Sequence, residues 1–431
     1  MTSHDDNLSV DLAIIGAGMA GMSAAVMAIA RGLTVAQAGL TGEILFSSGF
    51  LDFMSIHPIS ERRFWNNPWH AVQVLTRDNP DHPYARISSS LMNHAWDTML
   101  AFFNREGLPY YRAVDENTQM ITSQGTVKST YCLPRTMLAG ADGLKHQLPC
   151  LLVDFNGLRG FSAIQIAETL QNRWKNIQPL HLCFPNTDGL TEQYPEQMAK
   201  AMEIPSNREK LAEMIRPHLK DALVVGMPAI MGIENSVQAV SDLSERLDRP
   251  VFEIPTIPPS APGIRLKETF ERALPKMGVN QFIQKRVLRV KFLSDGCFRL
   301  NIGNIEMENT ITARAVILAT GRFFGGGLVA DLNGIRESVM NLPVVSLSER
   351  FQWHRDDFFD PCGHPIHLAG IEVDDRFRPL NGSGMPAHPN LFAAGSILAY
   401  QDWIRSKSGV GLSFCTAAAA VDACASLLSD K

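Results

Sequence analysis

Clustered cysteine is missing from this chain of 431 residues. The seven cysteines form no CxxC pair and are odd in number; they stand at positions 132, 150, 183, 297, 362, 415 and 424. Iron–sulfur clusters and structural zinc sites need grouped thiolates, and a disulfide framework needs paired cysteines. The sequence therefore predicts no metal centre, no disulfide framework and a reducing, cytoplasmic compartment.

An excess of basic residues is also missing. Lys and Arg total 39 against 44 Asp and Glu, which gives a formal net charge of -5. Proteins that bind nucleic acids usually carry a basic excess that neutralises phosphates. With 45% hydrophobic and 19% charged residues, the chain has the composition of a globular protein. We expect no nucleic-acid partner and, at roughly 100–200 residues per domain, two or three domains.

One stretch without charge, residues 12–30, is long enough to cross a bilayer. It is interrupted by Gly16, Gly18 and Gly21, and Asp11 precedes it where a signal peptide would carry basic residues. Glycines at this spacing indicate a strand, a turn and a helix. The stretch therefore predicts no transmembrane segment, so any contact with a membrane must be peripheral or through another chain.

The same stretch fits a βαβ unit. Residues 10–15 form an apolar run typical of a buried parallel strand, alanines predict a helix after Gly21, and a second strand begins near Leu33. In a GxGxxG turn, Gly16 permits the tight turn, Gly18 lets backbone approach a pyrophosphate, and Gly21 lets the helix pack on the strand. The helix N-terminus then supplies N–H groups for phosphate. The competing interpretation is a glycine turn that only packs a helix on a sheet.

An acidic residue is missing where such a unit needs one. The second strand normally ends near Asp or Glu, which accepts hydrogen bonds from the adenosine ribose. Here the strand runs Ala36-Gln37-Ala38-Gly39, and no acid follows until Glu43. Either Gln37 or Thr41 takes this role, or the adenosine half is held loosely, or it is absent.

Two later segments repeat the pattern of residues 10–16, an apolar strand followed by a glycine. Residues 315–321 and 390–395 are apolar strands that end in a glycine. With the N-terminal glycines they resemble the three-part signature of two-domain FAD-dependent oxidoreductases. A separate alternation of strands and helices begins near Pro149 and predicts a small parallel sheet of its own. We therefore expect an α/β protein in which a discontinuous Rossmann-like flavin-binding domain, residues 1–57 and 279–431, carries an inserted α/β domain, residues 58–278.

Three further blocks are similar to those of one family, the B subunit of anaerobic glycerol-3-phosphate dehydrogenase. They are residues 46–52 (FSSGFLD), residues 257–266 (IPPSAPGIRL) and the pair 323–330 and 333–337 (FFGGGLVA and NGIRE). The similarity runs from the N-terminal glycines to the C-terminal helix. Residues 408–411 depart from the pattern, because the family has a denser glycine run there.

The resemblance implies a flavoprotein that works with a catalytic A subunit and an iron–sulfur C subunit at the cytoplasmic side of the inner membrane. Such a complex oxidises glycerol 3-phosphate to dihydroxyacetone phosphate and passes electrons to quinone in fumarate or nitrate respiration. The family's B subunit is described with FMN, which lacks adenosine and so agrees with the missing acid; FAD is the alternative flavin. Without grouped thiolates this chain cannot hold the iron–sulfur relay, so its electrons must leave to another protein.

The candidate site residues lie in these segments. Hydroxyl and backbone donors at residues 47–49 suit the phosphate and ribityl portion of a flavin, with a polar surface loop as the competing interpretation. Arg265 and Arg336 stand beside glycines, where a guanidinium could grip the substrate phosphate, although a surface ion pair of Arg336 with Glu337 competes. No side chain is assigned as the catalytic base. The predicted cofactor residues are Gly16, Gly18, Gly21, Ser47, Ser48, Gly49, Thr320, Gly321 and Gly395.

Two other functions stay open on the sequence alone. The first is another flavin-dependent oxidoreductase of a small hydroxy acid. The second is an assembly protein that keeps a flavin-like fold without turnover. A bulky residue in place of Gly18 would block the approach of a phosphate. Loss of flavin with assembly of the complex intact would then favour an enzyme over a scaffold.

Overall fold

The computed structural model describes residues 7–187 and 190–429, which form two compact units. Unit 1 comprises the chain up to Glu43, residues 52–102 and the chain from Phe270 onward. Unit 2 comprises residues 44–51 and 103–269. Each unit is built around its own β-sheet, so the expected α/β fold with a discontinuous first domain is confirmed.

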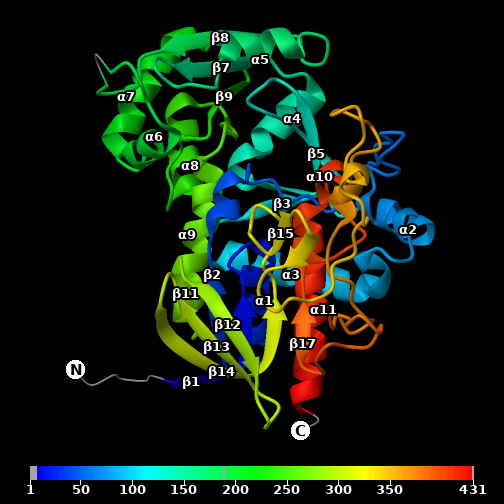
Figure 1. The fold of residues 1–431 in the computed structure, drawn as a ribbon. Coiled ribbons are helices and arrows are strands. Elements are labelled where there is room, and N and C mark those ends of the chain that lie inside the picture. Colours follow the sequence, from blue (N-terminus) through cyan, green and yellow to red (C-terminus); the bar gives the residue numbers. More distant parts are fainter. Residues whose placement is uncertain (1–6, 188–189, 430–431) are drawn as a thin grey trace. The chain divides into compact units, whose positions relative to one another are not determined.

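Unit 1 contains a seven-stranded sheet in the order β11-β2-β1-β14-β13-β12, with β17 also paired to β14 (Figure 1). Strands β11, β2, β1, β14 and β17 are parallel, whereas β12, β13 and β14 pair antiparallel. The sheet thus joins the first and last parts of the chain. Its strands are β1 (Asn7–Ile15), β2 (Val35–Gly39), β11 (Asn280–Ile283), β12 (Arg286–Phe292), β13 (Phe298–Gly303), β14 (Met307–Leu318) and β17 (Leu391–Ala393).

The charge-free N-terminal stretch forms the end of β1, a turn and helix α1 (Met19–Ala30), which confirms the sequence interpretation. Nearly all of α1 is buried, because it packs against both the sheet and helix α11 (Gly409–Ser429). A side chain at Gly21 would collide with the carbonyl of Gly16, so only glycine lets α1 lie this close to the turn.

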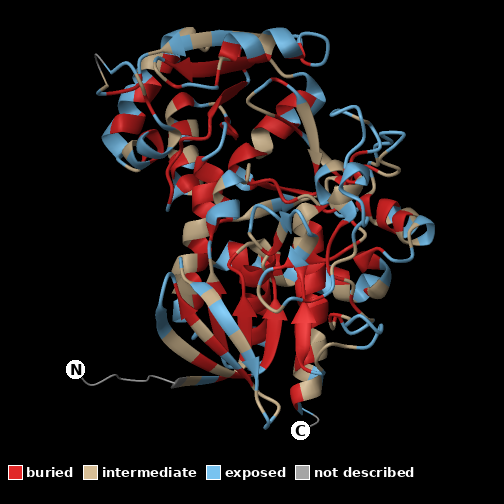
Figure 2. Ribbon diagram, viewed as in Figure 1, coloured by how far each residue is buried: buried red, intermediate tan, exposed pale blue. Residues whose placement is uncertain are grey.

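Helix α11 is the one helix in the described part of the chain that is both long and apolar enough to cross a membrane. It is mostly buried, and it contacts α1, β14 and β17 (Figure 2). Small residues such as Ala417, Ala420 and Cys424 allow this close packing. These contacts are typical of a helix in the core of a domain.

Helices α2 (Pro68–Asp78) and α3 (Ser89–Arg105) join unit 1 through an aromatic cluster. The ring of Phe53 lies 4.7 Å from that of Trp69 and 5.5 Å from that of Trp96, and Trp96 lies 5.0 Å from Phe414 of α11. The division into units therefore differs from the boundary expected at residue 58, since residues 52–102 belong to unit 1. Remaining elements of unit 1 are α10 (Trp403–Ser406), β15 (Leu328–Asp331) and β16 (Gly334–Glu337).

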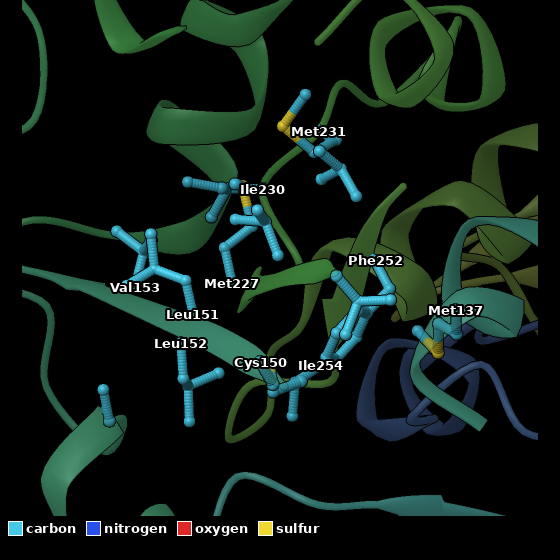
Figure 3. Packing of buried hydrophobic residues seen from close by; sticks show 14 of the residues in the cluster. Met137, Cys150, Leu151, Leu152, Val153, Met227, Ile230, Met231, Phe252 and Ile254 are labelled. Atoms are coloured by element: carbon cyan, nitrogen blue, oxygen red, sulfur yellow. The ribbon is translucent and has the colours of Figure 1, made fainter. Parts of the chain in front are cut away.

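Unit 2 is built on a four-stranded parallel sheet in the order β10-β9-β7-β8, as the alternation after Pro149 predicts. Leu152, Met227 and Phe252 come from three of these strands and belong to its apolar core (Figure 3). The strands of this sheet are β7 (Cys150–Phe155), β8 (Ile177–Leu182), β9 (Val224–Pro228) and β10 (Val251–Ile254). Unit 2 also contains two small sheets, which pair β3 (Tyr110–Arg112) with β6 (Cys132–Pro134) and β4 (Thr118–Ile121) with β5 (Val127–Thr130). Its helices are α4 (Leu138–His146), α5 (Ala163–Leu170), α6 (Pro195–Met202), α7 (Pro205–Ile215), α8 (Ser236–Leu247) and the first half of α9 (Ala261–Lys276).

A buried ion pair lies inside unit 2. Arg265 of α9, 2% exposed, donates two hydrogen bonds of 2.6 and 2.8 Å to the carboxylate of Glu253, which is 0% exposed. The Nε of Arg265 donates to the carbonyl of Gly232, and Glu253 also accepts from the N–H of Met231. All of these groups satisfy one another, so removal of one partner leaves a buried charge uncompensated.

We predict that Arg265→Met lowers the free energy of unfolding by about 3–5 kcal/mol, because Glu253 then stays buried without its counter-charge. Urea unfolding followed by circular dichroism measures this change. The double variant Glu253→Gln/Arg265→Met should recover most of the loss, since glutamine still accepts from Met231. A single variant as stable as the natural chain would contradict the prediction.

Candidate functional site

A cavity of about 450 Å³ opens in unit 1 beside the carboxyl ends of β1, β2 and β14. The carboxyl edge of a parallel sheet is where α/β proteins usually bind their ligands. The volume falls within the range of small-molecule and cofactor pockets. The residues that line the cavity are 15–18, 38–40, 42, 43, 286, 287, 319–321, 324–326, 329, 338 and 339.

The first glycine of the motif is a structural joint. Gly16 has a φ of +128°, and a side chain there would collide with the carbonyl of Ala319 at the end of β14. Its N–H donates to the carbonyl of Ala38, and its carbonyl accepts from the side chain of Gln37. Gly16 therefore holds the ends of three strands together.

The second glycine opens on the cavity. Gly18 precedes α1 with an ordinary φ of -81°, and no described side chain caps the N–H groups of the first turn of that helix. The position that a Cβ would take at Gly18 is free, with Oε2 of Glu43 as the nearest atom at 3.7 Å. Uncapped N–H groups and the positive end of a helix dipole are features that suit a phosphate.

The second predicted segment meets the first at this cavity. Ile15 pairs with Leu318 in adjacent strands, which places Thr320 and Gly321 opposite the glycine turn. The hydroxyl of Thr320 is buried and has no hydrogen-bond partner among the described residues. A buried hydroxyl without a partner is uncommon in folded proteins.

The third segment adjoins the site but does not line it. Gly395, with a φ of +82°, follows β17, and a Cβ there would lie 2.5 Å from the Cβ of Ala20 in α1. Its N–H donates to the hydroxyl of Thr416 in α11. Gly395 and Gly21 therefore act in packing around α1.

Residues 47–49 belong to unit 2 and are not among the described residues that line the cavity. The hydroxyl of Ser47 accepts from the N–H of Gly49, and that of Ser48 accepts from the N–H of Phe50. A side chain at Gly49 would collide with Pro262. The local contacts of this turn are those of a structural element of unit 2.

The two candidate substrate arginines belong to different units. Arg265 is the buried partner of Glu253 described above, so its three nitrogens are already engaged. Arg336 lies on the β15–β16 hairpin, half exposed and 3.7 Å from Asp331. Its neighbour in sequence, Glu337, is not its partner, because that carboxylate is buried and accepts the N–H groups of residues 339 and 340.

Sequence reasoning missed Glu43 as a cavity residue. Glu43 follows β2 in a single 3-10 turn (Gly42–Phe46), which brings its carboxylate back beside the glycine turn. Oε1 of Glu43 lies 3.4 Å from the position of a Cβ at Gly321 and 3.0 Å from that at Gly325. Glu43 is exposed at the cavity, and partial desolvation by the nearby protein raises the pKa of its carboxyl.

The two residues considered as substitutes for the missing acid are occupied. Gln37 is fully buried; it donates to the carbonyl of Gly16 and accepts from Gln281. Thr41 is also fully buried, and its hydroxyl accepts from Gln284. Neither is among the described residues that line the cavity.

These residues fit a flavin nucleotide. The free N–H groups in the first turn of α1 suit its phosphate, the absent side chain at Gly18 permits close approach, and Thr320 lines the same cavity. The remaining walls, which include Leu40, Val287 and Phe324, are apolar enough to cover an aromatic ring.

A family model covers most of the chain. Residues 11–412 match the family model described as an FAD binding domain, which gives the expected FMN no support. A solved 3-ketosteroid Δ1-dehydrogenase from Sterolibacterium denitrificans is similar at 12% identity, with a TM-score of 0.43 over 97% of this chain and 100% of that one.

Curated relatives match nearly end to end, and each is named as the B subunit of anaerobic glycerol-3-phosphate dehydrogenase. The relative from Vibrio vulnificus is 30% identical over 96% of each chain. The relative from Yersinia pseudotuberculosis is 28% identical over 95% of this chain and 96% of its own length. A relative from Halobacterium salinarum, named as a probable member, is 28% identical over 98% and 99%. The chain therefore belongs to the family of anaerobic glycerol-3-phosphate dehydrogenase B subunits, flavin-dependent oxidoreductases with an FAD binding domain.

Proposed function

We propose that this chain binds FAD and takes part in the oxidation of glycerol 3-phosphate to dihydroxyacetone phosphate. The observation that carries the proposal is the cavity in which the uncapped N-terminus of α1 meets Thr320 and Gly321. The printed names of the relatives supply the substrate. A flavin bound there supplies an acceptor for the hydride from C2 of the substrate.

Support for FAD over FMN comes from the matched FAD binding domain and from the shape of the cavity. The lining continues past the glycine turn to Leu40, Arg286 and Val287, at the ends of β2 and β12. An adenosine half would use this added length. The N–H groups at α1 would hold the pyrophosphate, and Thr320 would donate a hydrogen bond to it.

The partners follow from the relatives' name and from the cysteines. A protein named as the B subunit of an enzyme works in a complex, and we propose a catalytic A subunit and an iron–sulfur C subunit as its partners. Because the seven cysteines are scattered, electrons from the flavin would pass to another chain on the way to quinone. Attachment to the cytoplasmic face of the membrane would be peripheral, through that complex.

We predict that Gly18→Val abolishes flavin binding and leaves the fold intact. A Cβ at Gly18 meets no protein atom closer than 3.7 Å, and its φ suits any residue, so the new side chain would fill only the space of the phosphate. Flavin per chain, measured by absorption after purification, should fall at least tenfold. Thermal unfolding should change little.

A matched control for this variant is Gly382→Val, since Gly382 also has open space around it and lies outside the cavity lining. It should keep its flavin. Equal flavin content in both variants would contradict the assignment of the phosphate to Gly18.

The proposed reaction is tested by anaerobic titration of the purified chain with glycerol 3-phosphate, with the visible absorption of the flavin as the signal. We expect the flavin to be reduced, at the latest when the A subunit is added. Reduction by the chain alone would place a complete substrate site within it. A flavin that stays oxidised with the whole complex present would overturn the proposed reaction, and reduction only by another small hydroxy acid would favour the alternative oxidoreductase.

A further inference from the structure

We propose that Glu43 binds the adenosine ribose of FAD in this chain and thereby makes the site prefer FAD to FMN. This inference rests on the proposed function, because it concerns the same cavity. It assigns to a residue of the 3-10 turn the role that an acid at the end of the second strand has in ordinary dinucleotide-binding units.

The backbone explains why no acid stands at the end of β2. A Cβ at Gly39, the last residue of the strand, would lie 2.5 Å from the N atom of Ala17 and 2.8 Å from Cα of Gly16. The strand end is therefore pressed against the glycine turn, and only glycine fits there. Any ribose ligand has to come from a residue beyond the strand.

Glu43 is an acid beyond the strand that lies at the cavity, because the 3-10 turn brings it beside the glycine turn. Its carboxylate lies among Gly18, Gly321 and Gly325, so it borders both the glycine turn after β1 and the segment after β14. Among the described residues, none donates a hydrogen bond to this carboxylate or forms an ion pair with it. Glu43 is exposed and lines the cavity, so its carboxylate oxygens are free to accept hydrogen bonds from a ligand.

The chemistry of a carboxylate selects the ligand group. An ionised carboxylate has two acceptor oxygens and no donor, which suits the two neighbouring hydroxyls of a ribose. It repels a phosphate, which has to lie instead toward the N–H groups of α1. Arg286 is the other charged residue among the described lining residues. The pKa of Glu43 is raised because no donor offsets the desolvation of its carboxylate, and hydrogen bonds from a ligand would offset it.

The two flavins differ in this respect. FAD carries the ribose diol next to its pyrophosphate, so Glu43 gains two charge-assisted hydrogen bonds when FAD binds. FMN ends at its single phosphate and has no adenosine, so it brings no ribose diol to Glu43. Glu43 therefore strengthens the binding of FAD and weakens that of FMN.

The test compares Glu43→Gln with the unaltered full-length chain, each freed of flavin and titrated with FAD and with FMN. Flavin fluorescence gives the two dissociation constants. We expect the affinity for FAD to fall about ten- to a hundredfold, because a bond to a charged group is replaced by a neutral one. The affinity for FMN should stay the same or rise.

Two controls make the test specific. Glu306→Gln removes an exposed acid at a hairpin end outside the cavity lining and should change neither constant. An FAD analogue with deoxyribose in its adenosine half should bind more weakly than FAD to the unaltered chain. With Glu43→Gln this difference should be much smaller, because the acceptor is no longer a carboxylate.

Other outcomes would overturn the inference. An equal loss of FAD and FMN would assign Glu43 to shaping the cavity, and tighter binding of both would show that it only repels phosphate. Unchanged constants in Glu43→Gln would also refute it, with the proposed function left standing. Failure of the unaltered chain to bind either flavin would refute the proposed function and this inference together.

Discussion

The candidate site depends on the pairing of β1 with β14. The two strands run parallel from Asn7 opposite Thr310 to Ile15 opposite Leu318, and they join the N-terminal glycine turn to a segment far along the chain. Their ends are so close that Gly16 has no room for a side chain beside the carbonyl of Ala319. The cavity begins where these two backbones separate, so the same contact builds the sheet and positions the site.

The glycines around this contact have different physical roles. Gly16, Gly21 and Gly39 allow backbone to touch backbone, and a side chain at any of them would collide with main-chain atoms. Gly18 alone in the GxGxxG motif borders open space. The interpretation of the motif as a packing device is thus correct for two of its glycines. Once Gly16 and Gly21 have set the turn, Gly18 leaves open the space in which we propose that the phosphate binds.

The local features of the fold were predictable because their signals lie close together in the sequence. Apolar runs followed by glycine at residues 10–16, 315–321 and 390–395 became strands β1, β14 and β17 of a single sheet. The boundaries of the units were less predictable, because residues 58–102 join unit 1 through ring contacts between Phe53, Trp96 and Phe414. Such contacts between distant residues leave no periodic pattern.

The roles of single charged residues needed the tertiary structure. Arg265 stood beside a glycine in a block similar to that of the family, yet it is buried in unit 2 and pairs with Glu253 of β10. Glu43 stood too far beyond β2 to be counted as a cavity residue, and the 3-10 turn returned it there. By itself, the sequence determined the family, the flavin chemistry and the strands that carry the glycine turns, since these depend on short motifs. Only the tertiary structure decided which side chains face the cavity, because that depends on contacts between residues far apart in the chain.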